Sequence, residues 1–251
     1  MHLRDRIAFR LLALAFVFAL ALPAWAAKPA PTQVIPVGAP PSPSDPGMAA
    51  TQCQMGIVPP AANRRDLIIN PPDDRYYTLL TRGGCPTCPQ HAYRLSAAHV
   101  QLSFSEHCSI PVTVSVVAAD VSIPGCAKPI PEQVVCPPAQ FVLSDGGVLN
   151  NCVDFTLPLP AGCCVDRDVF LEFRFDNGTC VPGHPWVCGP PSCADCQQYN
   201  IYPGSPPGGD DLCQVLSPFG TYGIIMYADA ECCASTPTLP GTWGHLKTLY
   251  H

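Results

Sequence analysis

Three segments of the chain alternate apolar and polar residues over six or more positions. They are 100–106 (VQLSFSE), 111–120 (PVTVSVVAAD) and 168–176 (DVFLEFRFD). A period of two is typical of a strand with one buried and one solvated face. In the third segment, the pattern predicts that Glu172 and Arg174 point outward. Shorter strands are expected at 76–81, 141–143, 153–157 and 223–228.

No segment has an apolar stripe of helical period longer than two turns, and turns rich in proline, glycine and aspartate separate the strands. This pattern predicts an all-β fold, namely a disulfide-rich antiparallel β-sandwich or jelly-roll-like domain. Asp176-Asn177-Gly178 is a tight-turn sequence and predicts a hairpin after the third strand. Between Cys180 and Cys213 the strand pattern stops, so we expect a long cysteine-dense loop excursion at one edge of the sandwich.

The N-terminal residues have the pattern of a secretory signal peptide. Three arginines precede an apolar run at 11–22, and Ala24-Trp25-Ala26 then supplies small residues at the two positions that signal peptidase recognises. We therefore expect cleavage after Ala26. The alternative is an uncleaved anchor helix, but the apolar run of about 12 residues is shorter than the roughly 20 needed to span a bilayer.

Composition divides the rest of the chain into a linker, a domain and a tail. The linker is rich in proline and lacks cysteine, which predicts an extended, solvated segment. The tail carries apolar residues and is interpreted as a docked last strand or as a sorting or assembly tag. The expected segments are a signal peptide at 1–26, a Pro-rich linker at 27–52, a disulfide-stapled β-sandwich domain at 53–235 and a C-terminal tail at 236–251.

The charge balance argues against two classes of partner. The chain has 13 Lys and Arg residues against 19 Asp and Glu residues, a net charge of −6. Three of these basic residues and one acidic residue lie in the signal peptide, so cleavage changes the net charge to −8. An acidic chain is repelled by nucleic acid and by anionic membrane surfaces, so neither is expected as a main partner, and no membrane insertion of the mature chain is expected.

The 16 cysteines all follow the expected cleavage position. An even number of cysteines in a secreted chain predicts a full set of disulfides. Adjacent cysteines should bond to different partners, because neighbouring residues of a strand point to opposite faces. The cysteines predicted to be bridged are Cys53, Cys85, Cys88, Cys108, Cys126, Cys136, Cys152, Cys163, Cys164, Cys180, Cys188, Cys193, Cys196, Cys213, Cys232 and Cys233.

The motif Cys85-Pro-Thr-Cys88 allows other interpretations besides structural disulfides. A thioredoxin-like dithiol opens a helix, whereas here Pro89 follows the second cysteine and the sequence continues like a strand. A structural zinc site could use a second motif at Cys193 and Cys196, but zinc ligand pairs are usually much closer in sequence. Structural disulfides are therefore the preferred interpretation.

Aromatic and polar residues inside the excursion are the candidate ligand-binding residues. Flat rings on a stapled loop, with polar groups close by, could stack against a sugar and donate hydrogen bonds to it. The alternative is that the rings form a small core of the excursion itself. The candidate residues are Trp186, Tyr199, Asn200 and Tyr202.

Two acidic pairs are candidate calcium ligands, because calcium binds several oxygens from loops. They are Asp166 with Asp168, and Asp210 with Asp211. The preferred interpretation is that these carboxylates are solvated turn residues, and no other cofactor is expected. The spaced histidines, including His99, are interpreted as solvated surface residues rather than metal ligands.

The chain has no G-x-S-x-G elbow, no H-E-x-x-H motif and no phosphate-binding glycine loop. The preferred hypothesis is a secreted, non-catalytic extracellular module with a structural, adhesive or binding role, with carbohydrate as the candidate ligand of the 180–213 excursion. Its partners would be an extracellular glycan or a cell-surface protein. The alternative is a secreted polysaccharide hydrolase with unassigned carboxylates, and a third hypothesis is a periplasmic thiol or metal protein. In a bacterium, the expected location is the periplasm or the cell surface.

Overall fold

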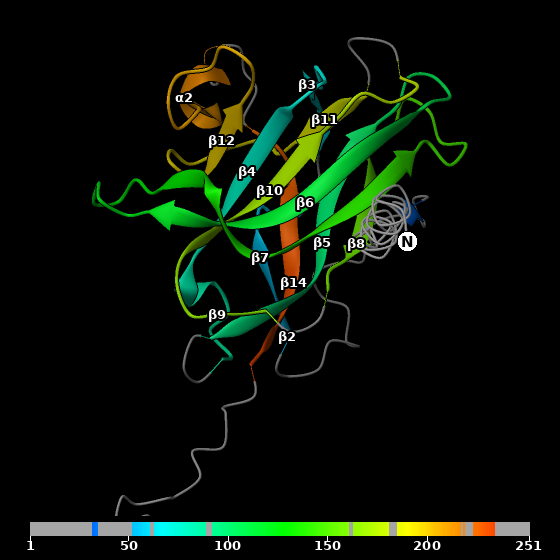
Figure 1. The fold of residues 1–251 in the computed structure, drawn as a ribbon. Helices are drawn as coiled ribbons and strands as arrows, with labels where there is room; N and C mark the ends of the chain where they lie inside the picture. The colour runs from blue at the N-terminus through cyan, green and yellow to red at the C-terminus, as the bar shows by residue number, and fades with distance from the viewer. Residues whose placement is uncertain are drawn as a thin grey trace, which may run out of the picture. The chain divides into compact units, whose positions relative to one another are not determined.

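The alternating segments form two packed β-sheets in the computed structural model (Figure 1). The structure describes residues 32–34, 52–60, 63–88, 92–160, 163–180, 185–216, 218 and 223–233. The expected signal peptide and C-terminal tail lie outside the described residues, as does most of the linker. The described residues all belong to one structural unit, Pro31–His251.

The first sheet, called sheet A here, has seven strands. All its pairings are antiparallel except that of β1, which pairs in parallel with β7 through Thr32↔Phe141. Three residues of the expected linker are therefore part of the sheet. In spatial order, the strands are β1 (Thr32–Val34), β7 (Lys128–Ser144), β6 (Ser109–Asp120), β10 (Val169–Phe175), β4 (Asp74–Leu80), β12 (Gln198–Ile201) and β13 (Asp210–Asp211).

The second sheet, called sheet B, is built around β5 (Tyr93–Ser103) and is antiparallel throughout. One side of β5 pairs with β8 and β9, and the other side pairs with β14 and β11. The remaining strands are β2 (Gln52–Gly56), β3 (Arg64–Ile68), β8 (Val153–Pro158), β9 (Cys164–Val165), β11 (Trp186–Gly189) and β14 (Met226–Cys232). Two short helical segments complete the described elements, the 3-10 turn η1 (Arg82–Gly84) and the helix α2 (Leu212–Leu216).

Alternate residues from both sheets fill the space between them and confirm the predicted sandwich. Val114 and Phe173 of sheet A and Val100 and Leu157 of sheet B are fully buried in one continuous apolar cluster. Burying side chains of this size stabilises the fold by about 1.5–3 kcal/mol each. The alternation of apolar and polar residues along these strands therefore has the predicted cause, because the apolar face of each strand packs against the opposite sheet.

Three predictions of detail were wrong. The turn at Asp176 does not form a hairpin, because β10 pairs with β4 and β6 and the next strand, β11, lies in sheet B. The strand pattern does not stop after Cys180, since β11, β12 and β13 all lie in this segment. Glu172 does not point into solvent, because its side chain is buried and accepts a hydrogen bond from Tyr77, which belongs to a second, smaller apolar cluster on the outer face of sheet A. This cluster consists of Tyr77, Val117, Ala127, Phe170 and Tyr199.

Gly178 is required by a close approach of two chain segments. A Cβ atom at this position would meet the backbone oxygen of Ser109 and would lie 2.9 Å from the Cα of Ile110. Both atoms belong to the backbone of β6, so moving either of them would distort that strand at a cost in free energy. We expect Gly178→Ala to lower the free energy of unfolding by about 1–3 kcal/mol, measured by denaturant titration with the disulfides intact. Gly83→Ala is the matched control, because nothing lies within 4 Å of its Cβ position; an equal loss in both variants would contradict this explanation.

All 16 cysteines lie in the described residues and form eight disulfides, as predicted. Both adjacent pairs bond to separate partners, because Cys163 bonds to Cys136, Cys164 to Cys233 and Cys232 to Cys88. The bridges are Cys53–Cys85, Cys88–Cys232, Cys108–Cys180, Cys126–Cys196, Cys136–Cys163, Cys152–Cys188, Cys164–Cys233 and Cys193–Cys213. Neither CxxC motif is bridged internally. Disulfides at this density indicate an oxidising extracellular environment.

Among the described residues, no helix combines the length and the apolar character that crossing a membrane requires.

Candidate functional site

Two disulfides hold together one end of sheet A, which we call the stapled end. It consists of the β6–β7 turn (120–128) and the segment 190–216, which carries β12, β13 and α2. Cys126–Cys196 links the turn to this segment. Within the segment, Cys193–Cys213 links the residues before β12 to α2. The stapled end contains most of the residues that the sequence nominated for ligand binding.

Tyr202 and Asp210 form an exposed pair at the stapled end. The Tyr202 hydroxyl donates a hydrogen bond to the Asp210 carboxylate at 2.9 Å, and 40% of Tyr202 is exposed. That hydrogen bond raises the pKa of Tyr202, because the carboxylate disfavours a second negative charge. The ring is therefore fixed by its hydroxyl while it stays accessible to solvent.

Asn200 lies two residues before Tyr202, and its side chain forms hydrogen bonds with residues of β4 instead of Asp210. Its side-chain amide donates to Asp74 Oδ1 at 2.8 Å and to the backbone oxygen of Arg75 at 2.9 Å. The other oxygen of Asp74 accepts from the Tyr76 hydroxyl and from the backbone of Asn70. Burial raises the pKa of Asp74, and these hydrogen bonds oppose the shift only in part. Asn200 thus secures β12 to β4.

The other two aromatic candidates do not join Tyr202. Tyr199 is only 1% exposed and packs edge-on against Phe170 with ring centroids 5.7 Å apart, so it belongs to the small core on the outer face of sheet A. Trp186 lies in β11 of the other sheet, where the guanidinium of Arg65 sits 6.0 Å from its ring. The four predicted residues therefore do not form one binding platform, and Tyr202 is the ring that the stapled end exposes.

The four aspartates proposed as calcium ligands make separate contacts, three through hydrogen bonds and one through an ion pair. Asp168 accepts from the backbone of Arg82, and Asp211 accepts from the backbones of Cys196 and Cys213. Asp166 lies 3.6 Å from Arg167, and Asp210 accepts from Tyr202 as described above. Across the described ranges, no group of three or more His, Cys, Asp or Glu side chains is arranged to hold a metal ion.

Sequence reasoning missed a buried charge network on sheet B. His99 was expected to be a solvated surface residue, but it is 2% exposed. Its Nδ1 lies 2.9 Å from Asp154 on β8, and its Nε2 lies 2.9 Å from Asp229 on β14. Tyr227 stacks on the imidazole with centroids 4.2 Å apart and donates to Asp154. The imidazole thus joins three neighbouring strands on the face opposite the core.

The His99 network is a cation held between two anions. Burial alone would lower the pKa of His99, but the hydrogen bonds to Asp154 and Asp229 outweigh it and raise the pKa to about 9. With both ring nitrogens donating to carboxylates, the imidazole is protonated at neutral pH. It has no nitrogen left to act as a base, so this network stabilises the sheet rather than forming a catalytic site.

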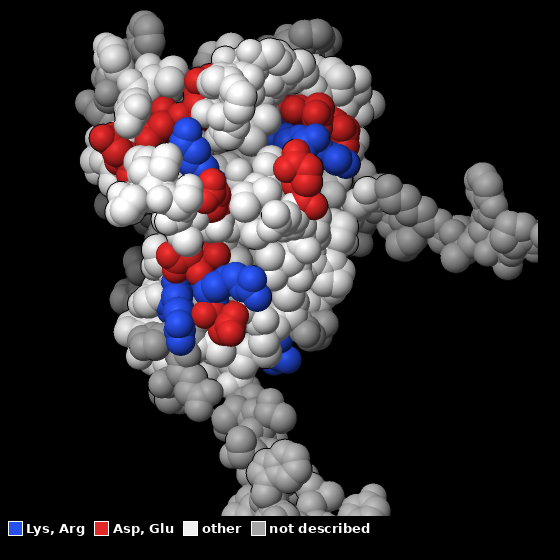
Figure 2. Space-filling model, turned by 60° about the vertical axis from the view of Figure 1, so that its left-hand side comes forward, with Lys and Arg blue, Asp and Glu red and all other residues white. Residues whose placement is uncertain are grey.

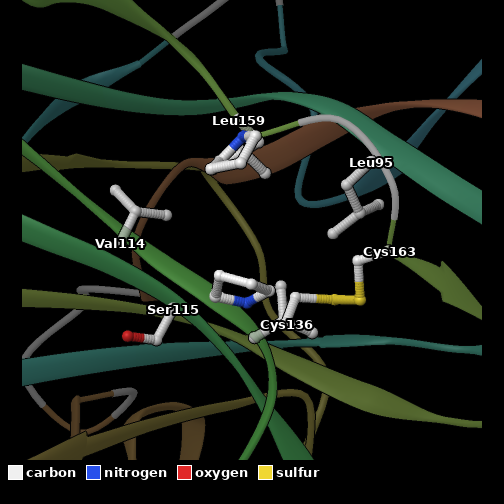
Figure 3. Close-up of a pocket in the computed structure, with 9 residues that line it drawn as sticks. Leu95, Val114, Ser115, Cys136, Leu159 and Cys163 are labelled. Atoms are coloured by element: carbon white, nitrogen blue, oxygen red, sulfur yellow. A yellow bond between two sulfur atoms is a disulfide. The ribbon is translucent and has the colours of Figure 1, made fainter.

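A small apolar pocket, with a cavity volume of about 10 Å³, lies between strands of the two sheets. Figure 3 shows Leu95, Leu159 and Val114 facing its interior and the Cys136–Cys163 disulfide in its wall. Eight of its nine lining residues are apolar. A sugar site needs several convergent polar groups, so this pocket does not suit one.

Charged residues are distributed in small mixed groups. On the face shown in Figure 2, basic and acidic side chains lie next to one another and are separated by uncharged surface. Pairs such as Arg94–Glu231, at 2.7 Å, and Arg75–Asp73, at 2.8 Å, are of this kind. This face therefore has no extended basic patch of the kind that binds nucleic acid.

The fold and its bridges define a disulfide-stapled, all-β sandwich protein. Residues 65–234 match a family described as a domain of unknown function, DUF7451, and the chain belongs to that family. Neither a curated protein nor a solved structure matches the chain.

Proposed function

We propose that this protein is a secreted, non-catalytic extracellular module that binds carbohydrate through the stapled end. The observation that carries the proposal is the exposed ring of Tyr202, held in place by Asp210 on a segment fixed by two disulfides. A rigid aromatic ring loses little conformational entropy when a ligand stacks on it, and stapling removes the cost of ordering the loop.

Polar groups beside Tyr202 support a hydroxyl-rich ligand. Arg75 of β4, which pairs with Ile201 in the register, forms an ion pair with Asp73 just before that strand, and the two side chains are 25% and 47% exposed. Together with Asp210, they offer both acceptors and donors of hydrogen bonds. The high disulfide content supports a location outside the cytosol, which in a bacterium would be the periplasm or the cell surface.

Binding is tested with a panel of soluble polysaccharides and a glycan array, using the disulfide-bonded protein. We expect Tyr202→Ala to weaken binding at least tenfold, which is about 1.4 kcal/mol, because the stacking surface is lost. Val134→Ala is the matched control, since Val134 is 51% exposed on β7, outside the stapled end. Equal affinity of the Tyr202 variant and the unmodified protein would refute the assignment of this site.

A polysaccharide hydrolase with unassigned carboxylates is the second candidate. Glycosidases need two carboxyl groups that flank the scissile bond. Asp74, whose pKa is raised by burial, is only 3% exposed and is hydrogen-bonded through both oxygens, so it is not assigned this role. The same polysaccharides are assayed for release of reducing ends. Release of reducing ends would favour the hydrolase, whereas binding without release supports the non-catalytic module.

A further inference from the structure

The motif Cys85-Pro-Thr-Cys88 brings two different disulfides into contact. Cys85 is bonded to Cys53 of β2, and Cys88 is bonded to Cys232 of β14. The Sγ atoms of Cys85 and Cys88 are nevertheless only 3.3 Å apart. Both inner cysteines are buried, at 0% and 1% exposure, whereas Cys53 and Cys232 are partly exposed.

We propose that this cluster is a thiol–disulfide exchange site that reacts with a dithiol, and that the exchange moves the bridge onto Cys85 and Cys88. The product contains a Cys85–Cys88 disulfide and free thiols at Cys53 and Cys232. The site is independent of the stapled end and of the function proposed for it.

The reaction proceeds by three successive displacements at sulfur. A thiolate of the dithiol attacks Cys232 Sγ, so the Cys88–Cys232 bond breaks and Cys88 leaves as a thiolate. Cys88 then attacks Cys85 Sγ, a Cys85–Cys88 bond forms, and Cys53 leaves and takes up a proton. The second thiol of the reagent displaces Cys232 and closes the reagent's own disulfide. The dithiol is oxidised by two electrons, and the protein loses one of its two bridges.

The geometry favours the middle step over release of the inner thiolate. At 3.3 Å, the two inner sulfurs are already within contact distance, so the second displacement is intramolecular and strongly favoured over a bimolecular one. A thiolate is poorly solvated at a buried position, so the charge is better placed on a partly exposed outer cysteine. Attack at Cys53 instead of Cys232 leads to the same product by the mirrored route.

The local turn holds the two inner cysteines in this arrangement. The backbone nitrogen of Cys88 donates to the oxygen of Cys85 at 3.1 Å, which closes the turn. The hydroxyl of Thr87 lies 3.5 Å from Cys85 Sγ, where it can donate to a developing thiolate. In the second motif of the same spacing, Cys193 and Cys196 are bonded to Cys213 and Cys126. Among the described residues, no such contact joins the sulfurs of Cys193 and Cys196.

Two single substitutions test the proposal without any reductant. In Cys53→Ser, the unpaired Cys85 should displace Cys232 from Cys88, so a maleimide should label Cys232 and peptide mapping should find a Cys85–Cys88 bond. In Cys232→Ser, the label should appear on Cys53 with the same new bond. A label that stays on Cys85 in the first variant, or on Cys88 in the second, would overturn the proposal.

Cys126→Ser provides the matched control at the second motif. Its unpaired Cys196 should itself take the label, and the Cys193–Cys213 bond should persist. Transfer of the label to Cys213 would show that partner exchange is a general property of split CxxC motifs rather than a consequence of the 3.3 Å contact, and would overturn the specific assignment.

Titration of the unmodified protein tests the same site if the variants fail to fold. One equivalent of dithiothreitol is added, the mixture is quenched with maleimide, and the disulfides are mapped by mass spectrometry. We expect labels on Cys53 and Cys232 together with a Cys85–Cys88 bond. Labels on both partners of one original bridge would show simple reduction without exchange and would refute the proposal.

Discussion

Replacement of His99 by glutamine is expected to lower the free energy of unfolding by about 3–5 kcal/mol. The imidazolium is the positive charge that both Asp154 and Asp229 contact at 2.9 Å. Asp154 is 5% exposed and shares no Lys or Arg ion pair within the described residues, so the substitution leaves it as an uncompensated buried charge. Glutamine can donate to one carboxylate but carries no charge.

The loss is measured by denaturant unfolding under non-reducing conditions, with the slope m compared between variants to check that the transition is unchanged. His107→Gln is the matched control. His107 also lies 2.9 Å from an aspartate, Asp145, but its side chain is 75% exposed. Such surface pairs contribute at most about 1 kcal/mol. Similar losses in both variants would show that burial of the His99 network has no special effect.

Stability is also expected to decrease as the pH rises from about 6.5 to 9. The pKa of His99 is about 9 in the folded protein, against an ordinary value near 6.5 in the unfolded chain. A group with a raised pKa contributes its full stabilisation below the unfolded value, and this contribution is lost as the pH rises through the folded value. The loss for this side chain is on the order of 3 kcal/mol.

The pH dependence is measured by denaturant unfolding at closely spaced pH values. The difference between the unmodified protein and His99→Gln should shrink across this interval, because the variant has no proton to lose at this site. A constant difference from pH 6.5 to 9 would contradict the assignment of His99 as the titrating group.

The strands that could be predicted from the sequence are those that bury one face against the opposite sheet. In β6 and β10, the alternation is visible because the apolar residues face the core over at least seven positions. The four-residue strands β11 and β12 are too short to show a period, and prolines and glycines surround them. They are strands because longer neighbours, β5 and β4, supply their hydrogen-bond partners.

The length of β7 was hidden by its prolines. The strand contains Pro129, Pro131, Pro137 and Pro138, which normally argue against a strand. They are tolerated for two reasons. Pro131, Pro137 and Pro138 fall where the register with β6 shifts and have no β6 partner, and on its other side β7 pairs only with β1, from Phe141 to Leu143. A strand with one unpaired side can omit backbone donors on that side.

The candidate sites were predicted less well than the fold. In a strand that alternates apolar and polar residues, the pattern predicts that every polar side chain faces solvent, even where a partner from another strand buries it. Glu172 and His99 both occupy the outward positions of their strands, yet each is buried by partners that are distant in sequence. The Tyr77 hydroxyl donates to Glu172 at 2.7 Å across 95 residues, and Asp229 contacts His99 across 130. Tyr202 could be nominated because an aromatic ring among turn residues is conspicuous without any knowledge of its neighbours.

The position of β14 has a consequence for the order of folding. β14 lies between β2 and β5, and in the described residues β2 pairs with β14 alone. Ribosomes deliver the chain from its N-terminus, so β2 and β5 are made long before the strand that joins them. Contacts of such high sequence separation close slowly. Sheet B is therefore completed only after translation has passed residue 232, and the bridges to Cys232 and Cys233 are among the last to form.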